Sequence, residues 1–309
     1  MNGIVNLVAI VILSQGKCGL SSCTTRYLVA MAMGDLLVII TGVILFKISY
    51  YYFPGSFLEI AAVCSVIAVL KRSASDCSVW FTVTFTFDRF VAICCQKLKT
   101  KYCTKQTAAM VLLTTCILLC LENIPYYFVF LSFGPPYLER QWIRAWRCQS
   151  YRTDPGWVGF GQFDMVLTPL LPFTLILLLN ALTVRHILVA RRVRKGLKGQ
   201  NKGEKCSDPE MESRRKSAIL LFTISGSFIL LWLLYVIQFL YFLIAGKDPR
   251  DYKDSEYIFL EVAWMLLNLS CCTNTFIYGA TQSKFREQFK RAVKYPITTF
   301  IQLMNRQNI

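Results

Sequence analysis

The sequence has little of what enzymes and metalloproteins use at their sites. It contains a single histidine, His186, and only 17% of its 309 residues are charged. Its 13 cysteines form none of the CxxC pairs that are typical of zinc sites. No nucleophile, base and orienting residue stand together in a motif either. These absences argue against an enzyme and against a cysteine-bound metal centre.

What the sequence has in abundance is apolar residues in long blocks. Hydrophobic residues make up 55% of the chain, and its mean hydropathy of +0.45 is high for a soluble protein. A helix needs about 20 apolar residues to cross roughly 30 Å of hydrocarbon. We therefore expect an all-α membrane protein with a complete span in each long block. These blocks lie at residues 27–46, 58–95, 107–133, 157–184, 217–245 and 257–279.

A seventh apolar block opens the chain but is shorter. Residues 1–13, MNGIVNLVAIVIL, would reach only about 20 Å as a helix. A signal peptide is the alternative, although the block has no basic start and no small-residue cleavage site. We interpret it as the inner part of a first transmembrane helix that is truncated at its outer end, which completes a seven-transmembrane helix bundle.

Basic residues indicate the orientation of the spans. Most of the 34 Lys and Arg residues lie at 14–26, 96–107, 185–217 and 279–309. Because cytoplasmic loops carry an excess of Lys and Arg, these segments are expected inside the cell and the start of the chain outside. The net charge of +16 is divided among short loops and not gathered on one face, as a nucleic-acid site would need. We therefore expect contact with anionic membrane lipids and no nucleic acid.

Asp88 and Arg89 stand next to each other in the stretch TFTFDRFVAICC, near the end of the apolar block at 58–95. Helix geometry places them about 36 Å from Cys64, at the cytoplasmic mouth of the bundle. Charged residues within spans are costly and usually face a cavity or the bundle interior, so the pair predicts a conformational switch. The alternative is that both side chains only snorkel to the membrane interface.

Several motifs, taken together and in order, resemble the rhodopsin-like (class A) G protein-coupled receptors. The sequence Asp-Arg-Phe at 88–90 is similar to the Asp-Arg-Tyr motif that ends the family's third helix. NTFIY at 274–278 is similar to its Asn-Pro-x-x-Tyr motif, with threonine in place of proline. FDRFVAICCQ, NIPYY and LLNALTVRHI resemble segments of the orphan receptors associated with aromatic amino acids and small peptides. Single residues that match the family's helices are Asn6, Asp35, Cys64, Pro172 and Trp232.

The resemblance implies a receptor domain at residues 1–283, followed by a short amphipathic eighth helix and a cytoplasmic tail at 284–309. It also implies a multi-pass protein of the plasma membrane with its C-terminus in the cytoplasm. Cys64 and Cys148 would both face the oxidising side, where a disulfide is allowed, and the resemblance implies that they form one.

The resemblance further implies a switch that couples to a heterotrimeric G protein. It assigns this role to Asp88, Arg89, Asn274 and Tyr278, with Arg89 restrained by Asp88 and partnered by Tyr278 when the bundle opens. Receptors of the family often hold this arginine with an acid from the sixth helix, where this chain has Arg214. Because like charges repel, we expect a weak restraint and appreciable ligand-free signalling.

A sodium site is implied at Asp35. Ser78, Ser270 and Asn274 occupy the positions that form the family's sodium pocket with this aspartate, and their oxygens suit a hard cation. An unpaired carboxylate in the middle of a span would be costly, so Asp35 needs partners. The alternative is a hydrogen-bond network without sodium. Apart from this ion, no cofactor is expected.

The ligand pocket is expected around Lys71, which lies on the same inward stripe of its helix as Arg89. Biogenic amine receptors have an aspartate at this position, whereas a lysine would repel an amine. A cation, acids and aromatic walls would suit an amphoteric ligand with an aromatic group, such as an amino acid derivative or a peptide end. The expected pocket residues are Lys71, Ser75, Asp164, Trp232, Tyr235, Phe239, Glu261, Trp264 and Asn268.

Charge pairing around Lys71 has two interpretations. Arg72 and Asp76 lie four residues apart and are expected to pair with each other along one helix. Lys71 would then bind a carboxylate of the ligand, or it would bridge Asp164 or Glu261 inside the pocket. The sequence leaves both interpretations open.

A secondary transporter is the remaining alternative to a receptor. Transporters typically show internal repeats and helices broken by paired Gly or Pro, and the sequence shows neither. A light-sensing opsin needs a Schiff-base lysine in its last span, but no lysine lies between Tyr257 and Ser283. We therefore expect a G protein-coupled receptor that binds an extracellular small molecule or peptide within its helix bundle.

Overall fold

Helices form all of the regular structure that is described. The computed structural model describes residues 2–48, 52–53, 56–131, 155–198, 209–245 and 253–292. The elements in chain order are α1 (Asn2–Ser14), α2 (Ser22–Val38), η1 (Ile39–Ile48), η2 (Phe57–Glu59), α4 (Ala61–Cys94), α5 (Gln96–Tyr102), α6 (Lys105–Asn123), α7 (Pro125–Leu131), α9 (Pro155–Met165), η5 (Val166–Leu170), α10 (Leu171–Lys198), α11 (Pro209–Ala245) and α12 (Asp254–Thr281). A further helical segment occupies residues 283–292.

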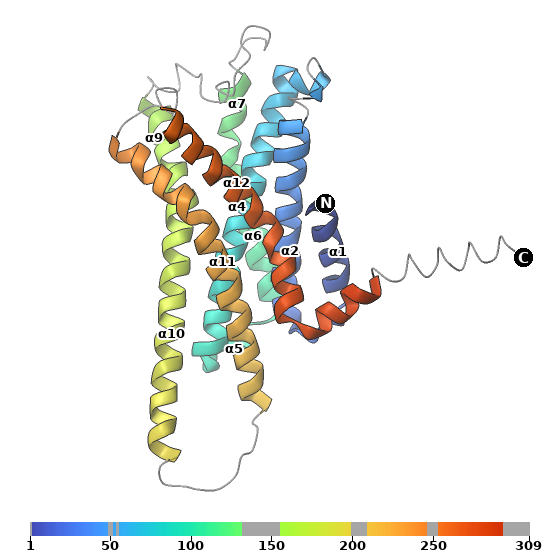
Figure 1. Ribbon diagram of the computed structural model, residues 1–309, viewed down its shortest axis with the longest axis vertical. Coiled ribbons are helices and arrows are strands. Elements are labelled where there is room, and N and C mark those ends of the chain that lie inside the picture. The colour runs from blue at the N-terminus through green and yellow to red at the C-terminus, as the bar shows by residue number, and fades with distance from the viewer. Residues whose placement is uncertain are drawn as a thin grey trace, which may run out of the picture.

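The long helices run side by side as a bundle, with α5 at one end and α7 and α9 at the other (Figure 1). α4 is the central helix, because it packs against α2, α6, α7, α10 and α11. Its 34 residues carry polar side chains at several depths, from Lys71 near one end to Arg89 near the other. We call these the Lys71 end and the Arg89 end of the bundle.

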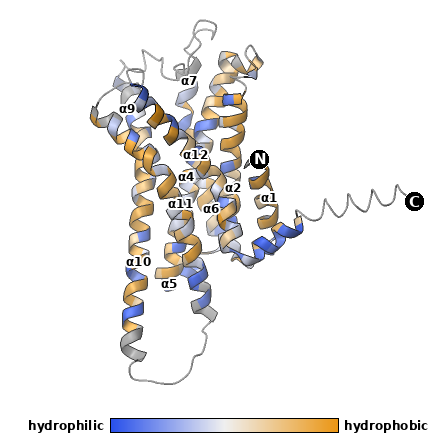
Figure 2. Cartoon of the chain, viewed as in Figure 1, coloured by the Kyte–Doolittle hydropathy of each residue, from blue (hydrophilic) through white to orange (hydrophobic). Residues whose placement is uncertain are grey.

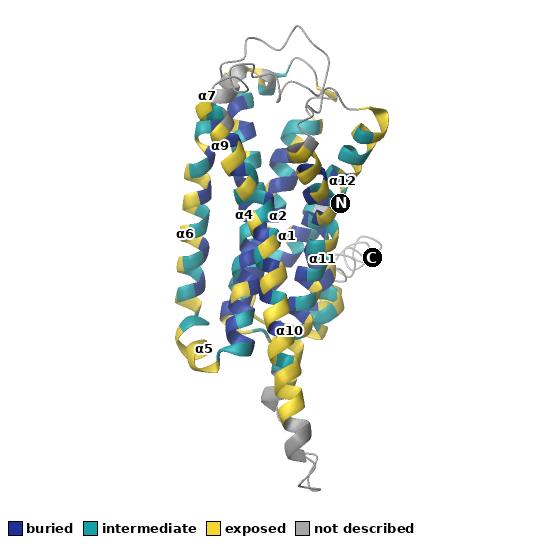
Figure 3. Cartoon of the chain, turned by 90° about the vertical axis from the view of Figure 1, so that its left-hand side faces the viewer, coloured by how far each residue is buried: buried dark blue, intermediate teal, exposed yellow. Residues whose placement is uncertain are grey.

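Within the described residues, six helical stretches are long and apolar enough to cross a membrane, in agreement with the six complete spans expected from the sequence. They cover Ser22–Ile48, Ala62–Cys94, Lys105–Phe128, Pro155–Val193, Arg214–Tyr241 and Asp254–Thr281. The shorter α1 lies against α2 and α12. Hydrophobic residues make up most of the long helices (Figure 2), and exposed positions lie along their outer sides (Figure 3). On α6, for example, Met110, Leu113 and Leu118 are each more than 60% exposed, as expected for a surface that faces lipid.

The expected span at 107–133 is not one continuous helix. α6 ends at Asn123 and α7 begins at Pro125. Proline lacks the N–H that would continue the helical hydrogen bonds. Ile124 keeps a helical backbone, with φ −54° and ψ −43°, so the helix loses a hydrogen bond here without turning away. The break therefore follows from Pro125, and it allows Asn123 and Tyr126 to reach the bundle interior, where both are buried.

Two π-helical segments interrupt the regular geometry of the spans. η1 continues α2 after Val38, and η5 separates α9 from α10. Within η5, Thr168 has a non-helical backbone with φ −145° and ψ 105°, directly before Pro169. Such bulges are a recognised cause of helix bends. The bulge in η5 lies four residues after Asp164 and so contributes to the position of that side chain.

The interior consists of aromatic and aliphatic side chains from several helices. At the Arg89 end, Tyr27, Phe85 and Tyr278 are fully buried in one cluster that also includes Phe285. In the middle of the bundle, Trp232 packs with side chains of α4, α10, α11 and α12. Since lipid is as apolar as these residues, close packing and polar contacts between helices hold such a bundle together.

The segment 283–292 forms a helix after Gln282, whose backbone is extended. Phe285 is 1% exposed and packs edge-on against Tyr278 at 5.9 Å, and Phe289 stacks on Phe285. The other side of the segment is hydrophilic (Figure 2). The segment is thus amphipathic and is anchored to α12 through its aromatic side. The boundary between the two parts of the chain at residue 283 stays a prediction.

Candidate functional site

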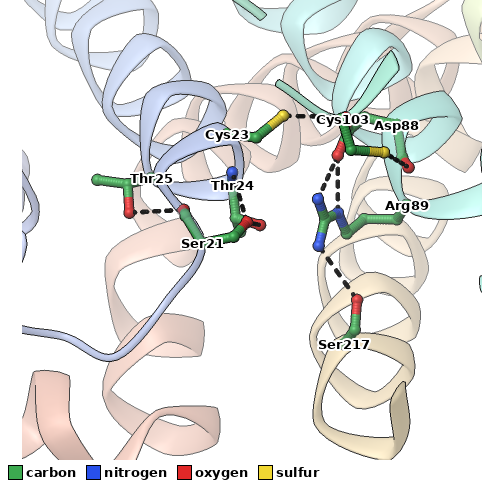
Figure 4. A network of polar contacts seen from close by, with 8 residues as sticks. All are labelled: Ser21, Cys23, Thr24, Thr25, Asp88, Arg89, Cys103 and Ser217. Carbon is green, nitrogen blue, oxygen red and sulfur yellow. Dashed lines mark hydrogen bonds and ion pairs between the residues drawn. The ribbon is translucent and has the colours of Figure 1, made fainter. Parts of the chain in front are cut away.

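Arg89 is the centre of a polar network at its end of the bundle (Figure 4). Both Asp88 and Arg89 lie on α4, and they are 0% and 7% exposed. The Arg89 Nε donates a hydrogen bond to Asp88 Oδ2 at 3.0 Å, and Nη2 contacts the same oxygen. Nη1 donates to the Ser217 Oγ of α11 at 3.3 Å. The guanidinium therefore connects α4 with α11 through one charged and one neutral partner.

Two cysteines surround Asp88 on the side away from Ser217. The Cys23 Sγ of α2 donates to Asp88 Oδ1 at 3.1 Å, and the Cys103 Sγ contacts the backbone oxygen of Asp88 at 3.7 Å. Burial and the neighbouring Asp88 carboxylate raise the pKa of Cys103 to about 11, so its thiol stays protonated and can donate. The hydroxyl of Ser21, which caps α2, accepts from the Thr24 N–H and fixes the turn that carries Cys23.

The α11 side of this network carries no acid that contacts Arg89 among the described residues. Glu212 forms an exposed ion pair with Lys216 at 2.8 Å, one turn along its own helix. The contact of α11 with Arg89 thus comes from the Ser217 hydroxyl. Many receptors of the family have an acid for this contact, at the position where this chain has Arg214. Tyr278 packs against Phe285, and its hydroxyl has no hydrogen-bond partner within the described part of the chain.

Asp35 lies deeper in the bundle and accepts two hydrogen bonds from other helices. The Ser78 Oγ of α4 donates to Oδ1, and the Asn274 Nδ2 of α12 donates to Oδ2 at 2.8 Å. Asp35 is 1% exposed. Both partners are neutral, so its negative charge is not balanced by either of them.

A small cavity lies next to Ser78 and Asn274, the two hydrogen-bond partners of Asp35, and has room for about one water-sized sphere. Asp35 itself is not one of the residues that line it. The polar lining of the cavity includes Ser75, Ser78, Ser270 and Asn274, and Trp232 forms part of its apolar wall. Hydroxyl and amide oxygens next to a carboxylate are the donors that hard cations prefer. The donor set therefore fits a sodium ion, and a hydrogen-bond network without sodium fits the same side chains.

The Lys71 end brings a cation and aromatic rings together. Lys71 Nζ lies 4.3 Å from the centre of the Phe46 ring and 5.5 Å from that of Trp264, within the range of cation–π attraction. A series of edge-on rings continues from Trp264 through Tyr235, at 5.7 Å, to Trp232, at 5.8 Å. No carboxylate lies within ion-pair distance of Lys71 in the described part of the chain. Phe46 was not expected from the sequence, because only the fold brings η1 beside α4.

The predicted pairing of Arg72 with Asp76 is wrong. Arg72 instead forms an ion pair with Asp164 of α9, and its guanidinium lies over the Tyr126 ring at 3.7 Å. The Tyr126 hydroxyl also donates to Asp164 at 2.9 Å. Asp76 accepts from the Asn123 Nδ2 at 2.7 Å. Contacts between helices thus replace the contact along α4.

The alternative in which Lys71 bridges Asp164 is not seen either, because Asp164 is bound by Arg72 and Tyr126 and no ion pair joins it to Lys71 in the described part of the chain. Of the other expected pocket residues, Ser75 and Trp232 line the small cavity next to Ser78 and Asn274. No contact joins Phe239, Glu261 or Asn268 to Lys71 in the described part of the chain. Phe239 is 7% exposed, Glu261 is partly buried, and the Asn268 Nδ2 donates to the Trp264 backbone oxygen at 2.8 Å. The predicted disulfide includes Cys148, which lies outside the described residues.

Sequence reasoning missed the polar side chains of α6. Glu122 and Asn123 occur at the end of an apolar helix, and acids and amides within spans usually have a role. That position was the available signal. It could not show which helices Glu122 and Asn123 face.

Comparison with known proteins decides the family. The sequence matches the model of the seven-transmembrane receptors of the rhodopsin family over residues 5–278. The chain belongs to this family. It is 22% identical over 298 residues to an "FMRFamide receptor" of Drosophila melanogaster, an alignment that covers 92% of this chain and 50% of that protein. It is 25% identical over 281 residues to "Probable G-protein coupled receptor 142" of Mus musculus, covering 87% of this chain and 65% of that protein.

Membership of the rhodopsin family makes the chain a multi-pass membrane protein of the G protein-coupled receptor class. The family consists of receptors and not of transporters or enzymes, which favours the receptor interpretation of the sequence. The chain spans about half the length of the Drosophila relative and 65% of the mouse relative.

Proposed function

We propose that the receptor binds an extracellular ligand at its Lys71 end and activates a heterotrimeric G protein at its Arg89 end. The observation that carries this proposal is the network of Arg89, in which one guanidinium connects α4 and α11. Because the contact on α11 is a neutral hydroxyl, moving α11 away from Arg89 costs the guanidinium one weak hydrogen bond and no ion pair among the described residues. Binding of a ligand to the open arrangement would shift the population toward it.

The charge distribution supports an orientation for this receptor. Basic residues occupy the exposed Arg89 end, including Lys97, Lys99, Lys101 and the basic face of 283–292. Such residues accumulate on the cytoplasmic side, against an anionic leaflet. We therefore place the C-terminus in the cytoplasm and the Lys71 end outside the cell, in the plasma membrane.

The chemistry of the Lys71 end supports a ligand with a negative group beside an aromatic one. Lys47 adds a second positive charge near Lys71, and the rings of Phe46, Trp264 and Tyr235 line the same region. A carboxylate would pair with Lys71, while an aromatic group would stack on the rings. An aromatic amino acid derivative or a peptide end has both groups.

Substitution of Lys71 tests this proposal. A panel of amino acid derivatives and short peptides is first screened for receptor-dependent G protein activation. Lys71→Ala is expected to raise the half-maximal concentration of carboxylate-bearing agonists by roughly tenfold or more, because a charge-assisted contact is worth about 1.5–3 kcal/mol. Lys253→Ala, at an exposed position before α12, is the matched control. Unchanged potency of every carboxylate-bearing agonist in Lys71→Ala would rule out the carboxylate contact.

We also propose that sodium binds at Asp35 and stabilises the inactive arrangement. Sodium would reduce agonist affinity in wild-type membranes, and Asp35→Asn should abolish this reduction because it removes the charge. Agonist competition in sodium and in potassium, at equal ionic strength, measures the difference. A hydrogen-bond network without sodium predicts instead that the two salts give the same affinity in the wild type.

A further inference from the structure

Three carboxylates gather around Arg72, to the side of the proposed ligand pocket. Asp76 lies on α4, Glu122 on α6 and Asp164 on α9, and one oxygen of each lies within 4.8 Å of the others. Arg72 is the one basic side chain in ion-pair contact with these acids in the described part of the chain. One guanidinium cannot balance three ionised carboxylates inside the bundle.

Three buried oxygens in this group have no hydrogen-bond donor among the described residues. Two of them are the carboxylate oxygens of Glu122, which are inaccessible. The third is Asn123 Oδ1, and Asn123 is 0% exposed. The Asn123 amide lies against the carboxylates, because its Nδ2 donates to Asp76 Oδ2 at 2.7 Å. Buried oxygens without a partner are costly, and a bound cation would satisfy them.

The contacts that are already present leave carboxylate lone pairs free for an ion. Tyr126 and Arg72 donate to Asp164, and Asn123 donates to Asp76. A carboxylate has about four lone-pair sites on its two oxygens, so each acid can accept these donors and still face a cation. The Arg72 side chain is 36% exposed whereas that of Asp164 is 8% exposed, so the arginine marks the more accessible side of the group.

We propose that Asp76, Glu122 and Asp164, with the amide oxygen of Asn123, bind a hard divalent cation of the calcium class. Calcium–oxygen distances of about 2.3–2.6 Å place opposed ligands roughly 4.6–5.2 Å apart, whereas magnesium requires about 4.2 Å. The three carboxylate oxygens lie within 4.8 Å of one another, so a hard cation can contact all three, and calcium tolerates the irregular geometry of such a site better than magnesium, which demands a near-ideal octahedron. A divalent ion also brings the charge of three acids and one arginine to zero.

The site goes beyond the proposed receptor function and does not depend on it. It lies between α4, α6 and α9, whereas the proposed sodium site lies between α2, α4 and α12. The ion would connect three helices of the Lys71 end. It should therefore stabilise the folded bundle in the absence of any ligand or G protein.

Thermal unfolding of the purified chain in lipid nanodiscs tests the proposal. Tryptophan fluorescence is followed in EGTA and then with up to about 5 mM free calcium or magnesium at constant ionic strength. Calcium is expected to raise the midpoint saturably by roughly 2–8 °C, as mass action predicts for a dissociation constant of about 0.1–1 mM. Magnesium should produce a smaller shift. Equilibrium binding of radioactive calcium to the same samples should reach about one ion per chain.

Glu122→Gln keeps the size of the side chain and is expected to abolish both the calcium shift and calcium binding. Asp76→Asn serves as a second variant with the same expected loss if Glu122→Gln does not fold. Glu287→Gln, which removes an exposed acid on the 283–292 helix, should keep both effects. An equal calcium shift in wild type and Glu122→Gln would overturn the proposal. A second result would also overturn the proposal. If a lower pH raised the unfolding midpoint of the wild type but not that of Glu122→Gln, and calcium raised neither, then protons and not a metal ion would neutralise the group.

Discussion

Replacing Arg72 by glutamine is expected to reduce the stability of the receptor more than any other single change considered. The substitution leaves Asp76, Glu122 and Asp164 close together without a positive side chain. Removing one partner of a buried ion pair costs about 3–5 kcal/mol. Because the Arg72 side chain is 36% exposed, we expect the lower end of that range, about 3 kcal/mol. In EGTA, the unfolding midpoint should fall by roughly 6–12 °C.

A second substitution separates charge from packing in this experiment. If uncompensated acids cause the loss, Arg72→Gln combined with Asp164→Asn should be more stable than Arg72→Gln alone, because the double variant has one acid fewer. Arg191→Gln, at an exposed position on α10, should leave the midpoint within about 1 °C. Asp164→Asn is also measured alone in the wild type. If it lowers the stability of Arg72→Gln by as much as it lowers that of the wild type, the two residues act independently, against the ion pair described above.

Replacing Asp88 by asparagine is expected to increase ligand-free G protein activation about tenfold. Asp88 holds Arg89 through Nε and Nη2, and these are the charge-assisted contacts of the network. An amide keeps the shape of the side chain but loses the charge. We expect the substitution to weaken the Asp88–Arg89 contacts by about 1.4 kcal/mol, just below the usual range for charge-assisted hydrogen bonds. This free energy corresponds to a tenfold increase in the equilibrium constant for release of Arg89. Loading of a non-hydrolysable GTP analogue, normalised to the amount of receptor, measures the increase.

Two further variants serve as an intermediate case and as a control for this experiment. Ser217→Ala removes one neutral hydrogen bond to Arg89 and should raise ligand-free activation less than Asp88→Asn, by a few-fold. Glu212→Gln changes an exposed acid that pairs with Lys216 and should have no effect. If Asp88→Asn and the wild type activate equally without ligand, then Asp88 does not restrain Arg89 and the proposed switch must lie elsewhere.

The spans and the depth of most polar residues could be predicted from the sequence, because the length of an apolar helix is set by the membrane. The expected block at 58–95 and the helix at 61–94 differ by a few residues at each end. The same reasoning placed Asp35 in the middle of its span, and the family resemblance named Ser78 and Asn274 as its partners; the structure brings the three side chains into contact. Depth depends only on the number of residues along each helix, which a sequence shows directly.

Partners across helices could not be predicted in this way. Arg72 and Asp76 fit the spacing for a pair along one helix, yet α9 brings Asp164 to Arg72 and the end of α6 brings Asn123 to Asp76. The rotation of each helix decides these contacts, and the break at Pro125 and the bulge at Thr168 change that rotation locally. Arg89 shows the same limit. Its partner on α11 is Ser217, three residues after the position that the family motif indicated.

Exchange of nucleotide on purified heterotrimeric G proteins tests the central claim most directly, namely that this chain activates a G protein through Arg89. Membranes that contain the chain are compared, without ligand, with membranes that lack it and with membranes that contain Arg89→Ala at equal amounts. We predict exchange above the empty membranes for at least one G protein class, and its loss in Arg89→Ala. Exchange that equals the empty membranes for every class, or that Arg89→Ala leaves unchanged, would contradict the account.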